Sequence, residues 1–293
     1  MYSGILIVDK EEGISSARVV SLVRAAFNQK KVGHTGTLDL EASGLLPIVL
    51  GKATKVSDYM MEKQKTYITK AHFGIKTDTL DRAGEVIGKS DKVISRDDLE
   101  AILENYKGEI DQIPPMYSAL KVNGKKLYDL AREGKSIERK KRKVRIYDIK
   151  VIDFAFPLAT IEVTCSKGTY IRTLIDDIGE DLGTLAYVEG LRRIRVGDFL
   201  VEDAIRSQEI MATDIENLKA MLKGPDLALV QYERYDLDET YFKKVINGMT
   251  VKIPDKNQGL VRLYIDNEFI GLARTFLSKG EYFLKMEKIF YDR

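Results

Sequence analysis

Residues 33–39 read GHTGTLD, and residues 42–47, two positions further along the chain, read ASGLLP. The first segment places one carboxylate, Asp39, on a glycine-rich backbone shortly before the apolar run at residues 45–50. Glycine occurs where a backbone must turn tightly or approach a ligand closely. This order predicts a reactive side chain on a rigid loop that leads into a buried element. The alternative is a tight turn with a capping aspartate, because Gly, Thr and Asp are common turn residues.

The overall composition is that of a globular protein in a reducing compartment. The chain has 293 residues, of which 44% are hydrophobic and 31% are charged, enough for a large core and a satellite domain. No apolar run approaches the roughly 20 residues that span a bilayer. The first residues lack the basic region and apolar core of a signal peptide. The single cysteine, Cys165, excludes an intrachain disulfide, favours a cytoplasmic location and is expected to be a packed core thiol.

Basic residues gather in one part of the chain. The formal net charge of +2 is too small to argue for nucleic-acid binding by itself. Residues 121–150, however, contain twelve Lys or Arg and four Asp or Glu, a local charge of +8. Such segregation favours a directed site for a polyanion. The alternative is a solvated charged loop.

Apolar periodicity over the first four fifths of the chain predicts both strands and helices. We expect strands at residues 5–8, 65–74, 144–156, 158–165 and 191–196, and helices at residues 53–62, 99–106, 126–132 and 169–182. Ser15 or Ser16 is expected to cap one further helix. Ser95 and Asp98 resemble a capping box at the start of another.

The pattern of apolar residues changes near Tyr235. From there, short segments of alternating apolar residues follow one another, and Asp266-Asn267 has the composition of a hairpin turn. We therefore expect a small C-terminal β-barrel. The predicted division is a first domain at residues 1–232, with a basic insertion at about 117–150, and a second domain at residues 233–293.

Polar residues elsewhere favour structural roles. Asp78 and Asp81 lie three positions apart and precede Gly84, a spacing that favours a turn over a metal site. His72 lies in a strand pattern and is expected to be structural. Two separated histidines and one cysteine argue against zinc, so no metal is expected.

The order of three segments, GHTGTLD, ASGLLP and GKATK at residues 51–55, closely resembles the central motif of the tRNA pseudouridine-55 synthase (TruB) family. The segment KGTYIRT at residues 167–173 resembles a second family motif. Glu11 follows Lys10 where the family usually has proline, and Leu40 stands where proline usually follows the aspartate. The resemblance covers most of residues 4–200. It implies an α+β fold with a mixed, largely antiparallel sheet and helices, followed by a small β-barrel of the PUA type.

The resemblance also implies roles for three catalytic residues. The family reaction breaks the glycosidic bond of a uridine and joins C1′ to C5, and Asp39 is the carboxylate expected to assist at the sugar. Whether it attacks C1′ or promotes a glycal-type elimination stays open. Arg172 is expected to pair with Asp39. Tyr67 is expected to stack on the target base and to assist proton transfer.

Further residues match family positions that bind RNA. His34 corresponds to a histidine that fills the space left by the flipped base, with a general-base role as the alternative. Lys55 is expected to line the site, Tyr170 to bind substrate and Leu191 to pack near the base. The basic insertion is expected to close on the T stem-loop and to contact its backbone through a run of four cations, which are Arg139, Lys140, Lys141 and Arg142.

These expectations converge on one function. The chain is predicted to isomerise uridine 55 in the T loop of tRNA to pseudouridine, by flipping the base and using the Asp39 carboxylate. Because nothing is oxidised, hydrolysed or lost, no cofactor is expected. We expect a cytoplasmic monomer whose partner is tRNA and not a membrane. The alternative is a tRNA-folding factor that binds the T arm with secondary or absent catalysis.

Overall fold

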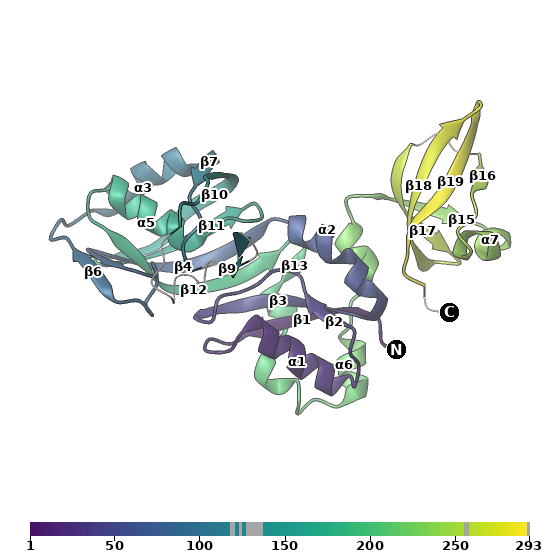
Figure 1. The fold of residues 1–293 in the computed structure, drawn as a ribbon, viewed down its shortest axis with the longest axis horizontal. Coiled ribbons are helices and arrows are strands. Elements are labelled where there is room, and N and C mark those ends of the chain that lie inside the picture. The colour runs from purple at the N-terminus through teal and green to yellow at the C-terminus, as the bar shows by residue number, and fades with distance from the viewer. Residues whose placement is uncertain (118–120, 123–124, 127–136, 255–257, 292–293) are drawn as a thin grey trace.

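A computed structural model describes residues 1–117, 121–122, 125–126, 137–254 and 258–291. Its largest element is a ten-stranded sheet in the order β14-β1-β3-β12-β4-β11-β10-β7, with β2 paired to β3 and β13 paired to β12 (Figure 1). All of its pairings are antiparallel except β1 with β14 and β3 with β12. The strands are β1 (Gly4–Lys10), β2 (Val32–His34), β3 (Ala42–Leu50), β4 (Lys65–Phe73), β7 (Gly108–Gln112), β10 (Arg142–Ala155), β11 (Leu158–Cys165), β12 (Ala186–Val196), β13 (Phe199–Leu200) and β14 (Ile205–Arg206).

Helices cover the large sheet and bury its apolar faces. The α-helices in the described residues are α1 (Ser16–Ala26), α2 (Ser57–Glu62), α3 (Arg96–Leu103), α5 (Ile171–Asp181), α6 (Ile215–Ala220) and α7 (Phe242–Ile246). Ser15 caps α1 by accepting a hydrogen bond from the Arg18 N–H, and Ser95 and Asp98 form the predicted capping box of α3. The expected helix at residues 53–62 begins as a 3-10 helix, η1 (Gly51–Val56), and continues as α2.

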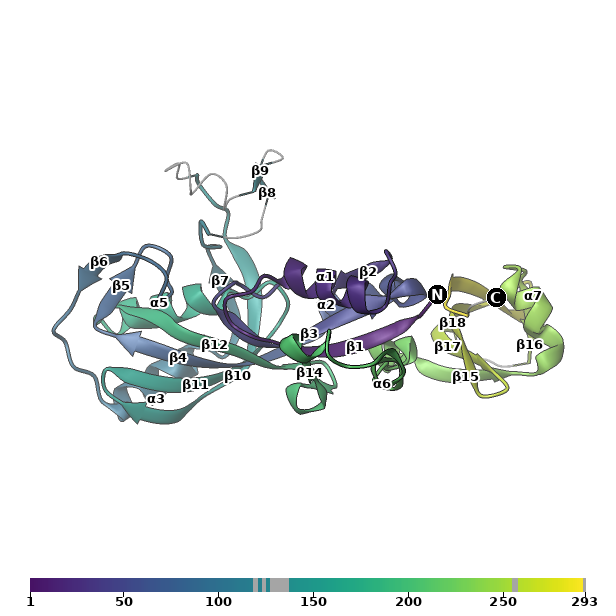
Figure 2. The same cartoon turned by 90° about the horizontal axis from the view of Figure 1, so that it is seen from below.

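The packing of α5 and α1 defines two halves of the main core. The apolar face predicted for α5, which includes Leu174 and Ile178, packs with Ala71 of β4 and Val188 of β12. The corresponding face of α1 packs with β1 and β3. Figure 2 shows α1 and the short β8–β9 hairpin (Lys121–Val122 and Lys125–Lys126) on the same side of the large sheet. A second hairpin, β5–β6 (Ile75–Thr77 and Val86–Lys89), extends one end of the molecule.

The C-terminal segment forms its own curled sheet, which confirms the predicted two-part α+β fold. Its order is β15-β17-β18-β19-β16, made of β15 (Glu233–Leu237), β16 (Val251–Ile253), β17 (Gly259–Ile265), β18 (Glu268–Ser278) and β19 (Glu281–Ile289). Asp266 and Asn267 both have positive φ, 51° and 62°, as the predicted tight hairpin turn requires. The five strands form a half-barrel. Leu272 and Phe290 of this part pack against Ile7 and Leu45 of the large sheet.

The strand expected at residues 144–156 is present as β10, which pairs with β7 on one side and β11 on the other. It overlaps the end of the basic insertion expected at about 117–150. The buried set Val144, Ile146 and Ile149 gives this strand a core-facing side in spite of its basic residues. Of the helix expected at residues 126–132, Lys126 belongs to β9, and residues 127–132 lie outside the described residues.

Candidate active site

A cavity of about 420 Å³ opens where the loop before β3, strand β4, the start of α5 and strand β12 meet. Five residues singled out from the sequence line this cavity: Asp39, Tyr67, Tyr170, Arg172 and Leu191. They come from positions up to 152 residues apart (39 to 191), so only the folded chain can assemble them. The volume lies within the range of ordinary small-molecule sites.

The loop that carries Asp39 is tied down on both sides. The Ser16 hydroxyl accepts a hydrogen bond from the Leu38 N–H (2.9 Å) and donates one to the Leu38 carbonyl (3.0 Å). On the other side, the Ala42 N–H donates to the Asp39 carbonyl (3.2 Å). The Asp39 side chain is 48% exposed, so its carboxylate faces open space although its backbone is anchored. A held carboxylate at the edge of a cavity is available to a bound molecule.

Arg172 is the residue that holds this carboxylate. Its side chain is only 7% exposed, and its Nη2 lies 2.9 Å from Asp39 Oδ2. The same guanidinium donates from Nη1 to Asp81 Oδ2 (3.0 Å) and to the Thr79 carbonyl (3.0 Å), and from Nη2 to the Tyr117 carbonyl (2.8 Å). Four acceptors therefore fix the direction of Arg172, which in turn fixes the carboxylate of Asp39.

Asp81 is a site residue that sequence analysis missed. The segment around it is a turn, as predicted, because Asp81 Oδ1 accepts from the Thr79 hydroxyl (2.6 Å) and the Ala83 N–H (3.1 Å). Its other oxygen, however, binds Arg172, 91 positions away. The sequence pattern at residues 77–84 predicted only the turn. The local spacing gave no reason to expect that Asp81, and not Asp78, would bind Arg172.

Tyr170 and the loop before α5 form another wall of the cavity. The buried Gln112 of β7 accepts from the Tyr170 N–H (3.0 Å) and donates to the Tyr170 carbonyl (3.2 Å). This reciprocal pair fixes the entry to α5, which begins at Ile171 and immediately supplies Arg172. Gln112 is a second positioning residue for which the sequence carried no signal.

Tyr67 and two buried cations line the inner part of the cavity. Burial raises the pKa of Tyr67 above its ordinary value. Lys65 lies two positions before Tyr67 on β4, and its Nζ donates to the carbonyls of Lys63 (2.6 Å) and Met61. Burial, with a smaller effect from Arg193, lowers the pKa of Lys65 to about 8. Lys65 and Arg193 were not among the predicted site residues.

His34 stands beside the cavity and not in its wall. It ends β2 and precedes Thr35, which does line the cavity. Its Nδ1 accepts a hydrogen bond from the Gly36 N–H at 3.3 Å. Burial, and then the charge of Arg193, hold the pKa of His34 below its ordinary value. Both effects favour the neutral form of the ring.

The structure corrects the expected position of Lys55. Its Nζ donates to the Ile289 carbonyl at 2.6 Å, so the side chain points toward strand β19 of the C-terminal sheet. Lys55 is not among the residues that line the cavity. Lys55 lies in the 3-10 helix η1, which directly follows β3.

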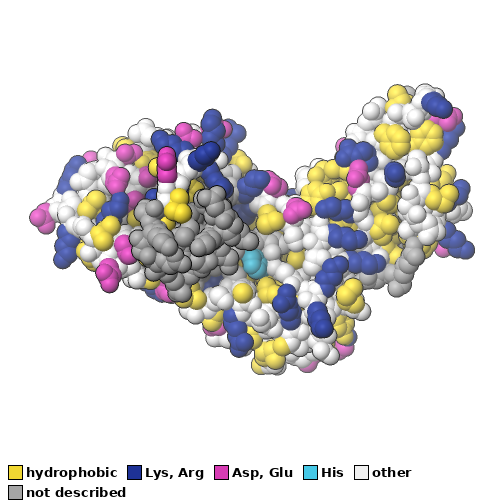
Figure 3. Space-filling model, viewed as in Figure 1, with side chains coloured by type: hydrophobic (Ala, Val, Ile, Leu, Met, Phe, Trp, Pro, Cys, Tyr) yellow, Lys and Arg dark blue, Asp and Glu magenta, His cyan; other side chains and the backbone are white. Residues whose placement is uncertain are grey.

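The four cations expected to contact RNA backbone are not equivalent. Arg139 is half-buried, and its Nη1 donates to the Pro114 carbonyl at 2.8 Å. The next three, Lys140, Lys141 and Arg142, are exposed. Figure 3 also shows Lys and Arg side chains spread along the visible face between α1 and the C-terminal sheet. The exposed cations are the ones available to a polyanion.

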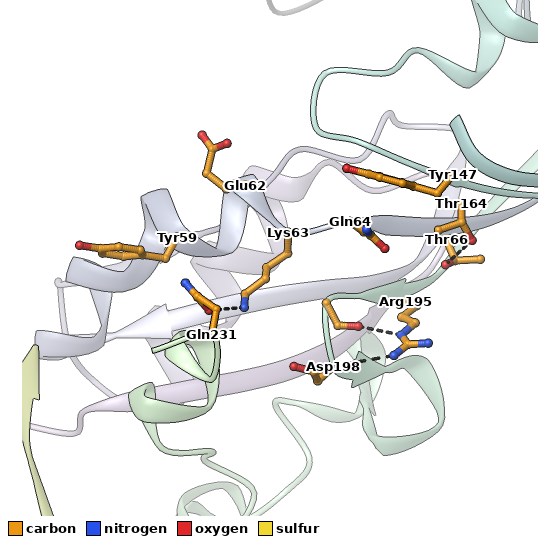
Figure 4. Close-up of a pocket in the computed structure, with 11 residues that line it drawn as sticks. Tyr59, Glu62, Lys63, Gln64, Thr66, Tyr147, Thr164, Arg195, Asp198 and Gln231 are labelled. Carbon is orange, nitrogen blue, oxygen red and sulfur yellow. Dashed lines mark hydrogen bonds and ion pairs between the residues drawn. The ribbon is translucent and has the colours of Figure 1, made fainter. Parts of the chain in front are cut away.

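A second cavity of about 530 Å³ lies near the end of β12, between α2 and the segment that leads to β15 (Figure 4). It is lined by Lys63, Arg195 and Gln231, among others, and by none of the residues predicted for the site. In the part of the chain that the structure describes, no cluster of three His, Cys, Asp or Glu could hold a metal ion. No helix among those residues has the length and apolar character needed to cross a membrane.

Known proteins resemble this chain over nearly its whole length. Residues 24–171 match the TruB family pseudouridylate synthase N-terminal domain, and residues 172–250 match the tRNA pseudouridylate synthase B C-terminal domain. The tRNA pseudouridine synthase B of Clostridium kluyveri is 43% identical over 98% of this chain and 99% of its own length. The enzyme of the same name from Azoarcus sp. is 40% identical over 93% of this chain and 91% of its own.

Among solved structures, the crystal structure of a Cbf5-Nop10-Gar1 complex contains a chain with the same fold. The TM-score is 0.75 at 24% identity, and the match covers 99% of this chain and 85% of that one. The family match and the sequence relatives show that the chain belongs to the TruB family of pseudouridylate synthases.

Proposed function

We propose that this protein isomerises uridine 55 in the T loop of tRNA to pseudouridine, with Asp39 as the catalytic carboxylate. The observation that carries the proposal is the anchored, half-exposed Asp39 carboxylate, held 2.9 Å from the buried Arg172 at the edge of a cavity of about 420 Å³. The relatives named tRNA pseudouridine synthase B support tRNA as the substrate. Position 55 and the T loop come from the resemblance of the Asp39 motif to the family.

The chemistry requires a group that acts at the ribose. The C1′–N1 bond must break, the uracil must rotate, and C1′ must bond to C5. Electron-poor states near C1′ are stabilised or trapped by a nearby carboxylate, as in glycoside chemistry. Asp39 is such a carboxylate. Arg172, shared between Asp39 and Asp81, keeps it in one orientation without neutralising its exposed oxygen.

Each of the other cavity residues has its own role in binding the base. Tyr67 offers a ring for stacking and a hydroxyl for proton transfer, and Leu191 offers an apolar contact on β12. Tyr170 forms the wall next to Arg172. The target base is stacked inside the T loop, so it must be flipped out to reach this cavity. The neutral ring of His34 then stacks in the vacated space.

RNA backbone contacts are assigned to the exposed cations. Lys140, Lys141 and Arg142 precede and begin β10, next to the segment expected to close on the T stem-loop. We assign residues 233–293, which include the half-barrel, to a PUA-like RNA-binding domain. The protein is expected to act as a monomer in the cytoplasm, where it meets tRNA.

The test measures chemistry and binding on the same samples. The T arm of tRNA carrying uridine tritiated at C5 releases tritium when C1′ replaces the C5 hydrogen. Wild-type protein should release it in a single turnover, and modified RNA should contain pseudouridine at position 55 only. Release from another uridine would refute the position. Tight binding without release would favour the tRNA-folding factor.

A further inference from the structure

Arg193 is a buried arginine without a carboxylate partner. Its residue is 2% exposed, and its Nε donates to the Leu45 carbonyl (2.7 Å) while its Nη2 donates to the Gly36 carbonyl (3.1 Å). Among the described residues, no carboxylate lies within ion-pair distance of this guanidinium. A buried charge without a counter-ion is costly, so its retention beside a cavity points to a role there.

The sheet register places this guanidinium against Tyr67. Arg193 of β12 lies directly opposite Tyr67 of β4 in an antiparallel pairing, so their side chains share one face. On its other side Arg193 pairs with Gly44 of β3, which has a φ of +103°. A Cβ at Gly44 would come within 2.2 Å of the Arg193 carbonyl oxygen. Only glycine therefore lets β3 approach closely enough to bring the Asp39 loop, Arg193 and Tyr67 together.

The electrostatics around the Tyr67 hydroxyl show what this contact does. The interior raises the pKa of Tyr67 by burial, and the charge of Asp39 acts in the same direction. Arg193 acts in the opposite direction, through its charge and through its polar contact with the Tyr67 side chain. Of these neighbours Arg193 is the group that makes a negative charge on the Tyr67 oxygen less costly.

We propose that Arg193 is a positioning residue for Tyr67, orienting its hydroxyl toward the cavity and stabilising negative charge on its oxygen. This inference rests on the proposed function, in which Tyr67 assists proton transfer. When the C1′–N1 bond breaks, N1 keeps the electron pair and takes the proton of the Tyr67 hydroxyl, so Tyr67 becomes a tyrosinate beside Arg193. After C1′ bonds to C5, the C5–H bond breaks and its proton passes to the tyrosinate oxygen, which restores the hydroxyl, whose proton then exchanges with solvent. The hydrogen bond from Arg193 to Gly36 at the same time ties Tyr67 to the loop that carries Asp39.

The neighbouring arginines of β12 provide a contrast. Arg192 pairs with Asp9 through two hydrogen bonds of 3.0 and 2.7 Å. Arg195 faces the second cavity, where its Nε donates to the Gly197 carbonyl at 2.7 Å (Figure 4). Of these three arginines, Arg193 is the one that lines the cavity with Asp39. Arg195→Gln is therefore a matched control on the same strand.

The test reads the ionisation of residue 67 directly. A single 3-fluorotyrosine at position 67 is titrated by fluorine-19 NMR in the full-length protein, with and without Arg193→Gln or Arg193→Lys. Removing a cation that contacts the hydroxyl should raise the midpoint by about one pH unit or more. The Lys variant should give a smaller rise, and Arg195→Gln should give none. An unchanged midpoint in a folded Arg193→Gln protein would overturn the proposal.

Two further readouts separate positioning from a purely structural role. In single-turnover assays, Arg193→Gln should lower the rate roughly a hundredfold and move the alkaline limb of its pH profile, while filter binding of tRNA stays close to wild type. Equal losses in rate and binding would refute a role through Tyr67. Failure of the proposed function would instead show as no turnover by the wild type.

A second comparison applies if both Arg193 variants unfold. Single 3-fluorotyrosine residues are then placed at position 67 or position 106 of the otherwise wild-type protein, and their titration midpoints are compared. Position 67, beside a cation, should titrate below position 106, whose hydroxyl donates to Asp181. The reverse order would refute the proposal.

Discussion

Converting Asp39 or Asp81 to asparagine, one at a time, should give opposite signatures, although both carboxylates bind the same guanidinium. Asp39→Asn keeps the shape and the anchored loop but removes the negative charge from the cavity. Asp81→Asn removes the charge next to the other guanidinium nitrogen, Arg172 Nη1, which lies 3.0 Å from Asp81 Oδ2. The Asp39 side chain is 48% exposed, whereas that of Asp81 is 13% exposed and that of Arg172 is 7% exposed.

The magnitudes follow from this difference in burial. The Asp39–Arg172 pair is half open to solvent, so its loss should lower the free energy of unfolding by less than about 1 kcal/mol. Its loss should reduce turnover roughly 10⁴-fold, as removal of a nucleophilic or charge-stabilising group does elsewhere. Loss of the buried Asp81 charge should cost roughly 2–3 kcal/mol of stability, because asparagine still accepts one hydrogen bond. A cost of about 2 kcal/mol transmitted to the transition state would slow turnover about thirtyfold.

Thermal unfolding and single-turnover tritium release on the same preparations measure both effects. Asp81→Asn should lower Tm by about 5 °C, and Asp39→Asn should leave Tm nearly unchanged. Asp78→Asn is the matched control in the same turn, because Asp78 is exposed and its carboxylate accepts a turn hydrogen bond from the Glu85 N–H at 2.9 Å. Appreciable turnover by Asp39→Asn, with deamidation excluded by mass spectrometry, would remove Asp39 from the catalytic role. Wild-type stability of Asp81→Asn would refute the account of Arg172.

Four further outcomes can be measured. Neutralising the three exposed cations of residues 140–142 should weaken tRNA binding and lower the salt slope by roughly 0.7–0.9 for each lost contact, whereas Arg139→Gln, already bound to a carbonyl, should change the slope less. Tyr67→Leu should abolish turnover, while Tyr67→Phe isolates the hydroxyl, and full activity of the Phe variant would leave only stacking. Lys243 and Lys244 are exposed on α7, and replacing both with Gln should lower tRNA affinity, so unchanged affinity would argue against RNA contacts there. Burial raises the pKa of the Cys165 thiol to about 11, so the reactive thiolate is scarce at pH 8. A thiol reagent should therefore label Cys165 only after unfolding, and rapid labelling of the folded protein would contradict this.

Much of the local structure could be predicted because neighbouring residues determine it. The Ser15 cap, the Ser95–Asp98 capping box and the Asp266-Asn267 turn depend on hydrogen bonds and φ angles within a few positions. The apolar face of α5 and the alternation of β11 likewise follow from the spacing of apolar residues along the chain, because the helix and strand periods determine which side chains share a face. The order of residues around Asp39 was specific enough to indicate the family.

The placement of the site depended on contacts that no local period encodes. Asp81 lies in a genuine turn, and only packing of α5 across the sheet brings Arg172 to its second oxygen. Lys55 belongs to the same motif as Asp39, yet its Nζ donates a hydrogen bond to the Ile289 carbonyl of the C-terminal sheet.

The three arginines near the end of β12 illustrate the division most clearly. The sequence by itself determined that a basic strand occurs there, and that Asp39 sits on a glycine-rich loop. Which arginine faces the cavity was decided by the register of β12 between β3 and β4, where Gly44 permits close approach and Tyr67 stands opposite. A strand presents its side chains to alternate faces, so a pattern fixes the alternation. The absolute face is chosen only when the strand pairs with its neighbours, because the burial that selects it involves residues more than a hundred positions away.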